Sequence, residues 1–152
     1  MSGSYYLLDT NVLLHWLRGS SVCSTIDGQF GLTASGFRPL VCEVTLGEIE
    51  AFVLSSKWSE GKRQKLSEVR KKLVVIDLTN ERIYRAFAEF STLAKEQGLA
   101  IFHDKNDLWI AAAAKVSGAM LLTTDAKGFK PLRDGKHLTT VVLDPKTGWP
   151  VP

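Results

Sequence analysis

The chain has 152 residues, of which 45% are apolar and 23% charged, so its composition is that of a folded domain with one hydrophobic core and excludes a disordered chain. The net charge of +3 allows an anionic partner without requiring one. Two cysteines exclude a disulfide framework, no apolar run approaches the roughly 18 residues of a membrane span, and the amino terminus lacks a signal-like stretch. We therefore expect a single domain over residues 1–152, located in the cytoplasm and without a membrane segment.

The first part of the chain predicts two strand–helix units. Residues 5–8 form a short apolar run, and residues 10–18 place apolar side chains at helical spacing. Residues 20–38 are rich in Gly, Ser and Thr, which favours a long surface loop or insertion. Residues 40–44 then predict a second strand, and residues 46–58 a second helix.

The remainder continues the alternation of short strands and longer helices. The predicted elements are a charged helix over 60–72, a strand over 73–76, helices over 81–97 and 107–116, strands over 120–122 and 139–143, a turn-rich segment over 125–136 and an irregular tail over 144–152. This alternation is typical of an α/β fold with a parallel sheet.

Four acidic residues occupy positions where such a sheet carries chemistry. Asp9 and Asp125 follow strands, Glu48 follows the second strand in the next helix, and Asp107 opens an alanine-rich helix. Ligands of parallel sheets bind beyond the carboxyl ends of the strands, where all four carboxylates can converge. Such a cluster is unfavourable without a cation, and oxygen ligands select Mg²⁺ or Mn²⁺. One ion or a pair of ions would suit phosphodiester hydrolysis.

Each acid taken singly also has a structural explanation. Asp9 can cap a helix, and Glu48 can complete a capping box with Thr45. Asp107 can complement a helix dipole with Asp104 as the cap, and Asp125 can be a turn residue. Their ordered placement at one sheet edge is what favours a shared site.

Four segments of the sequence carry the acids, each within a recognisable motif. The segments are Leu-Leu-Asp-Thr-Asn-Val-Leu-Leu from residue 7, Val-Thr-Leu-Gly-Glu-Ile-Glu from residue 44, Asn-Asp-Leu-Trp-Ile-Ala-Ala-Ala-Ala from residue 106, and Leu-Leu-Thr-Thr-Asp from residue 121 with Phe129. Together they resemble the PIN-domain ribonucleases, and within them the VapC-type toxins of toxin–antitoxin pairs. The resemblance covers residues 5–143, and the long segment 20–38 and the tail depart from it. It implies a three-layer α/β/α fold with a central parallel sheet of about five strands.

The resemblance also implies roles for the site residues. Asp9 and Asp107 would be the main metal ligands, and Glu48 and Asp125 would complete the catalytic cluster. Thr10, Asn11 and Thr123 would support the site. Because many family members carry Asn at the position of Asp125, its replacement should be milder than that of Asp9.

The expected partners are RNA, a VapB-type antitoxin and a second copy of the chain in a homodimer. Lys105, Lys127 and Lys130 flank the acidic motifs and are candidates for guiding RNA phosphates to the metal. Within the family, a nuclease of RNA processing or decay is the alternative to a toxin. Two other classes stay open: a phosphatase with an aspartate nucleophile, although Asn11 stands where a second acid is usual, and a non-catalytic RNA-binding module.

Overall fold

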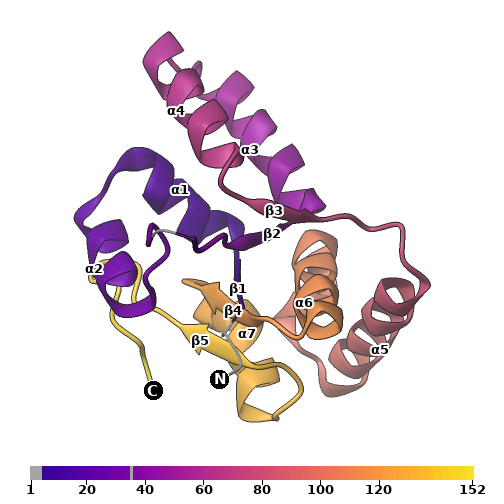
Figure 1. The fold of residues 1–152 in the computed structure, drawn as a ribbon. Helices are drawn as coiled ribbons and strands as arrows, with labels where there is room; N and C mark the ends of the chain where they lie inside the picture. Colours follow the sequence, from indigo (N-terminus) through magenta and orange to yellow (C-terminus); the bar gives the residue numbers. More distant parts are fainter. Residues whose placement is uncertain (1–4, 35) are drawn as a thin grey trace.

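A five-stranded parallel sheet forms the centre of the molecule. The computed structural model describes residues 5–34 and 36–152. The strand order is β3-β2-β1-β4-β5, and every pairing is parallel (Figure 1). The strands are β1 (Tyr6–Leu8), β2 (Leu40–Cys42), β3 (Val74–Ile76), β4 (Met120–Thr123) and β5 (Thr140–Val142). The predicted α/β class and the number of strands are confirmed.

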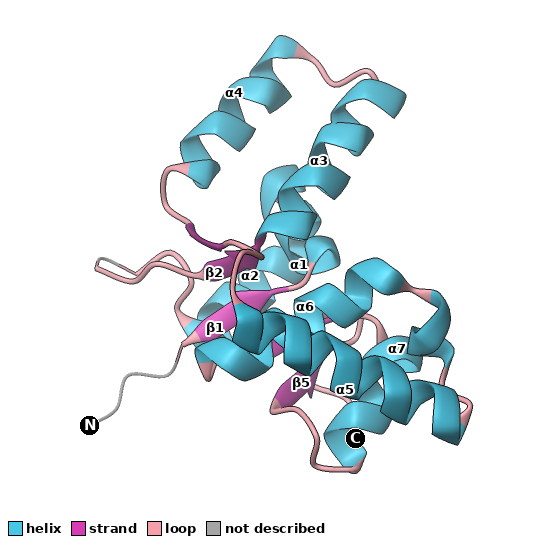
Figure 2. Cartoon of the chain, turned by 90° about the vertical axis from the view of Figure 1, so that its right-hand side faces the viewer, coloured by secondary structure: helices cyan, strands magenta, loops and turns pink. Residues whose placement is uncertain are grey.

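Helices cover both faces of this sheet. They are α1 (Thr10–Arg18), α2 (Ser21–Phe30), α3 (Glu43–Ser55), α4 (Glu60–Arg70), α5 (Glu81–Gln97), α6 (Lys105–Ser117) and α7 (Ala126–Asp134), with a 3₁₀ helix, η1 (Ala100–His103), before α6. The helices α3 and α4 form a hairpin that projects beyond the sheet (Figure 2). None of the helices in the described ranges has the length and hydropathy to cross a membrane.

Alternate residues of the central strands belong to two separate hydrophobic cores. Leu8 and Leu122 pack with apolar residues of α1 to α4, whereas Leu7 and Leu121 pack with residues of α5, α6 and α7. All four leucines are fully buried. Successive side chains of a strand point to opposite faces, so the short apolar strands are buried on both sides. The result is the three-layer α/β/α arrangement expected from the motifs.

The expectation of a loop over residues 20–38 is wrong for its first half. Ser20 caps α2 by accepting the N–H of Cys23 at 3.2 Å, and Gly31 ends the helix with a left-handed φ of 65°. Ile26 is 1% exposed and anchors the helix to the core. The Ser and Thr content hid this helix because those residues have low intrinsic helix propensity, which burial of Ile26 overrides.

The segment 125–136 was also misassigned, because most of it is the helix α7 rather than turns. Gly128 and Pro131 are helix breakers in isolation, yet both lie inside α7. Asp125 caps the helix, and the side chains of Phe129 and Leu132 form its fully buried face. Tertiary packing therefore stabilises a helix that local propensity disfavours.

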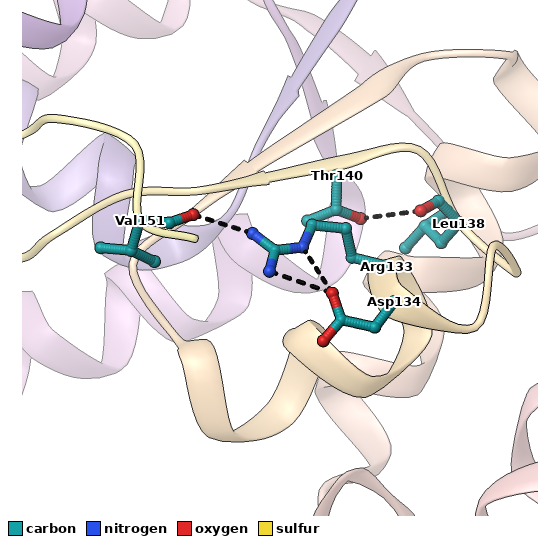
Figure 3. Close-up of polar contacts among 5 residues, drawn as sticks. All are labelled: Arg133, Asp134, Leu138, Thr140 and Val151. Atoms are coloured by element: carbon teal, nitrogen blue, oxygen red, sulfur yellow. Dashed lines mark hydrogen bonds and ion pairs between the residues drawn. The ribbon is translucent and has the colours of Figure 1, made fainter.

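The tail 144–152 contains no helix or named strand, as predicted, but it is tied to the domain. The guanidinium of Arg133 on α7 donates to the carbonyl of Val151 at 3.0 Å and pairs with Asp134 at 3.0 Å (Figure 3). Gln29 on α2 donates to the carbonyl of Gly148 at 2.8 Å. The tail thus connects α7 with α2.

Candidate metal-binding active site

The acids gather at the carboxyl edge of the sheet, around its central strand. Asp9 directly follows β1, and Asp125 follows the neighbouring strand β4. From β1 the chain runs to β2 on one side, and from β4 it runs to β5 on the other. The site therefore lies at the topological switch point, where ligands of open α/β sheets bind.

Asp9 is a buried carboxylate held by two donors. It is 3% exposed, its Oδ1 accepts the N–H of Thr10 at 2.8 Å, and its Oδ2 accepts the hydroxyl of Thr123 at 2.6 Å. The pKa of Asp9 is raised to about 6, because burial raises it by more than the two hydrogen bonds lower it, and the nearby charges of Glu48 and Asp125 add to the rise. The site thus holds a carboxyl group with a strong preference for a neutralising partner.

Glu48 reaches this centre from α3 through the hydroxyl of Thr10. The Thr10 hydroxyl donates to Oε1 of Glu48 at 2.6 Å and lies 3.0 Å from the hydroxyl of Thr45. The alternative of a capping box between Thr45 and Glu48 does not hold, because α3 already begins at Glu43 and both residues lie inside it. Glu48 is therefore free of a capping role and turned toward Asp9.

Asp107 lies in the first turn of α6, and Asp104 is the N-cap as predicted. Oδ1 of Asp104 accepts the N–H of Asp107 at 3.1 Å. Burial raises the pKa of Asp107 well above its ordinary value, and the charges of Asp9, Asp104 and Asp125 add to this effect. The interaction of its side chain with Asp125 raises the pKa further. Asp107 is the most strongly perturbed acid of the group.

Asp125 combines a capping role with a place in the cluster. Its Oδ1 accepts the N–H of Gly128 at 3.0 Å, and its own N–H donates to the Thr123 hydroxyl at 2.9 Å. Thr123 therefore joins Asp9 to Asp125 through one hydroxyl. Asp125 is thus the N-cap of α7 rather than a turn residue, and its charge acts on Asp9 and Asp107.

Gly128 and Thr45 belong to the site although the sequence did not single them out for it. A Cβ at Gly128 would lie 2.6 Å from Oδ2 of Asp125 and 3.5 Å from Oδ2 of Asp107. The absent side chain thus leaves room for two carboxylates beside α7. Helical spacing alone does not reveal such a close approach. The spacing of Thr45 to Glu48 was visible, but it indicated a cap.

The carboxylates shift one another's pKa, but their side chains do not converge on a common point as the ligands of a bound metal do. Across residues 5–34 and 36–152, no three His, Cys, Asp or Glu side chains converge as a metal-binding group. Mutual repulsion of like charges favours such separation. The chemistry of the donors still fits a hard divalent cation, because all four side chains offer oxygen.

Only one of the three candidate lysines faces the acids. Lys127 lines a depression of about 210 Å³ together with Asp104, Asp107 and Asp125. Lys105 instead donates to the carbonyl of Phe102 at 2.9 Å, and its ammonium lies 4.1 Å from the centre of the Phe102 ring. Lys130 is exposed and lies outside this depression.

The support predicted from the three polar residues is present for two of them. Thr10 and Thr123 bind site carboxylates directly. Asn11 is exposed, and its side chain makes no hydrogen bond with any residue that the structure describes. The structure therefore does not bring Asn11 into the cluster.

Comparison with known proteins places this site in a family. The pattern of the PIN domain matches residues 6–133, which is most of the chain and includes all four acids. The chain belongs to the PIN-domain family. This confirms the family resemblance and the fold that it implied. The cluster at Asp9, Glu48, Asp107 and Asp125 thus lies within the matched PIN domain.

Individual relatives are similar over most of this PIN domain. Ribonuclease VapC2 of Rickettsia felis is 28% identical over 125 residues, which cover 82% of this chain and 90% of that protein. The structure of VapBC2 from Rickettsia felis, bound to a DNA fragment from its promoter, superposes with a TM-score of 0.75 at 26% identity and covers 92% of this chain and 99% of that chain. VapBC-1 from nontypeable Haemophilus influenzae gives 0.69 at 23% identity, covering 91% and 97%.

Proposed function

We propose that this PIN domain is a Mg²⁺- or Mn²⁺-dependent endoribonuclease that hydrolyses RNA phosphodiester bonds. The observation that carries the proposal is the acidic centre, in which buried Asp9 and half-buried Asp107 both have a raised pKa. Strongly perturbed carboxyl groups in a depression at a switch point are typical of functional sites. The similarity to ribonuclease VapC2 supports RNA as the substrate.

Asp9 and Asp107 are the proposed principal metal ligands, with Asp125 and Glu48 completing the set. A divalent cation there would supply positive charge that promotes ionisation of a water molecule and stabilises the leaving oxygen. All four proposed ligands are carboxylates, so the donors favour Mg²⁺ or Mn²⁺ over Zn²⁺.

The surrounding residues would orient this machinery. Thr123 fixes one oxygen of Asp9, and Thr10 fixes the carboxylate of Glu48. Lys127 stands at the depression, where its ammonium can attract an RNA phosphate. Lys105 and Lys130 would contact phosphates further along the RNA strand. Fixed ligand orientation is worth about 10–100-fold in metal affinity or activity in comparable sites.

We further propose that the domain is the toxin of a toxin–antitoxin pair and forms a homodimer. Its structural relatives from Rickettsia felis and Haemophilus influenzae are VapBC assemblies. A VapB-type antitoxin is accordingly the proposed partner. The RNA target would be a cellular tRNA, rRNA or mRNA.

Cleavage by the purified protein tests the nuclease proposal. Wild-type protein should cut cellular RNA with Mg²⁺ or Mn²⁺ and lose activity in EDTA, and Asp9→Asn should abolish cleavage. Asp27→Asn is the matched control, because Asp27 lies on α2, whose last residue Phe30 packs on Tyr6 at the opposite end of β1, and because Asn can still accept the N–H of Thr33. Equal cleavage by wild type and Asp9→Asn would refute the assignment.

Expression in bacteria tests the toxin proposal separately. Induction of the wild-type chain should arrest growth, and Asp107→Asn expressed to the same level should not. Cleavage in vitro without growth arrest would favour a nuclease of RNA processing or decay. Growth arrest by both proteins would show that the effect does not come from the acidic centre.

A further inference from the structure

A second, cationic hollow lies at the end of the sheet opposite the acids. It measures about 340 Å³, within the range of roughly 300–1,000 Å³ that ligand pockets occupy. The apolar residues that line it are Ala86, Phe90 and Leu93, which we call its floor. The polar residues that line it, which we call its rim, are mostly basic: Glu89, Lys115, Lys136 and His137. Lys115 follows Asp107 by eight positions on α6, which is about 12 Å along the helix axis.

Lys115 and Lys136 are the unneutralised cations of this hollow. They also line a neighbouring depression with Arg133, so both lysines stand on the ridge between two hollows. Arg133 is engaged by Asp134 and by the carbonyl of Val151 (Figure 3). Over residues 5–34 and 36–152, neither lysine has a carboxylate within ion-pair distance. Neighbouring like charges are unfavourable, and a bound anion would relieve that cost.

The backbone beside the hollow is shaped to present these side chains. Lys136 has a φ of 59°, in the left-handed region that glycine adopts more easily. The glycine of this turn is instead Gly135, where a Cβ would lie 2.7 Å from the His137 ring. The His137 ring thus packs on the backbone of Gly135, and Lys136 occupies the left-handed position. Such strain is often retained where a side chain serves a function.

We propose that this hollow binds a phosphorylated nucleotide. The phosphate would lie between Lys115 and Lys136, and the base would cover the apolar floor formed by Phe90 and Leu93. Charged ammonium groups bind phosphate oxygens strongly, and an apolar floor gives a flat base a surface from which water is excluded. Glu89 offers an acceptor to a donor group on the base or sugar. This site is independent of hydrolysis at Asp9.

Binding without turnover tests the proposal, using the Asp9→Asn protein in EDTA. The probes are adenosine monophosphate, inorganic phosphate and a short fluorescent single-stranded RNA. At about 0.1 M salt, loss of one phosphate contact should weaken RNA binding about fivefold, because each contact releases roughly 0.7 counterion. Lys115→Ala and Lys136→Gly should each show this loss, and Lys95→Ala, an exposed lysine of α5 outside the hollow, should not.

Lys136→Gly controls for misfolding, because glycine adopts the left-handed backbone conformation of residue 136 without strain. The Tm of this variant should therefore match or exceed that of the Asp9→Asn protein. Lysine-dependent binding of adenosine monophosphate would assign a free nucleotide as the ligand. Lysine-dependent binding of RNA alone would assign a nucleotide of an RNA strand. Glu89→Gln should strengthen binding of either, because glutamine keeps an acceptor oxygen and removes a negative charge that repels the phosphate. Unchanged affinity of every probe in both lysine variants would overturn the inference.

Discussion

The hydroxyl of Thr123 donates a 2.6 Å hydrogen bond to Oδ2 of Asp9, and this bond ties the last residue of β4 to the residue that follows β1. The same oxygen accepts the N–H of Asp125 at 2.9 Å. One threonine therefore orients a proposed metal ligand and fixes the start of the loop that carries a second acid.

Replacing this threonine should disturb the site more than the fold. Thr123→Val removes the donor to Asp9, and we expect a loss of about 10–100-fold in RNA cleavage or Mn²⁺ affinity. Thr123→Ser keeps the hydroxyl and should retain most of both. Cleavage rates and Mn²⁺ titrations of the two variants check this. Equal losses in the valine and serine variants would show that side-chain volume, rather than the hydrogen bond, matters.

A methyl group at Gly128 should damage the centre without unfolding the domain. A Cβ there would lie 2.6 Å from Oδ2 of Asp125, so Gly128→Ala must displace that carboxylate. The matched control is Gly61→Ala in α4, where a Cβ meets nothing within 4 Å. We expect reduced cleavage for the first variant only, and unchanged or slightly higher stability for the second. Full activity of Gly128→Ala would show that Asp125 is dispensable.

In the metal-free protein, Asp9 should make the free energy of unfolding depend on pH. Because burial raises the pKa of Asp9 from 3.8 to about 6, the folded state holds a proton that the unfolded state releases. The contribution of protonated Asp9 to the free energy of unfolding is complete below about pH 4 and is lost as the pH rises through about 6. Asp107 acts in the same direction, because its pKa is also raised.

Asp9→Asn should therefore be more stable than wild type at about pH 7.5 in EDTA, by up to about 3 kcal/mol. The advantage should shrink towards about pH 4.5, where wild-type Asp9 is protonated. Chemical denaturation at both pH values measures this difference. A variant that is less stable than wild type at the higher pH would show that the Asp9 carboxylate is not destabilising.

Replacements of Asp125 should separate its two roles. Asn is a good N-cap, so Asp125→Asn should keep the contact with Gly128 and lose only the charge. Its activity should exceed that of Asp9→Asn. Asp125→Ala also loses the cap, which should cost about 0.5–2 kcal/mol of stability. Denaturation and cleavage assays on the same preparations distinguish the two effects.

The sequence predicted the sheet and the acids because their signals are local. Residues 5–8 and 120–122 are short apolar runs, Asp9 directly follows the first, and Asp125 lies three positions after the second. The helix α2 and the contribution of Gly128 were missed because both depend on tertiary packing. Ile26 stabilises a weak helical sequence by burial, and Gly128 matters only because two distant carboxylates meet it. Glu48 was ambiguous until Thr10 supplied its partner.

The most direct test of the central claim is the chemistry of the RNA ends produced by the purified protein. Attack by water under metal assistance should leave no 2′,3′-cyclic phosphate, and the cuts should require Mg²⁺ or Mn²⁺ and an intact Asp107. We predict uniform ends without a cyclic phosphate for wild type and no cuts for Asp107→Asn. Cyclic phosphate ends, or cleavage that persists in EDTA and in Asp107→Asn, would contradict the account.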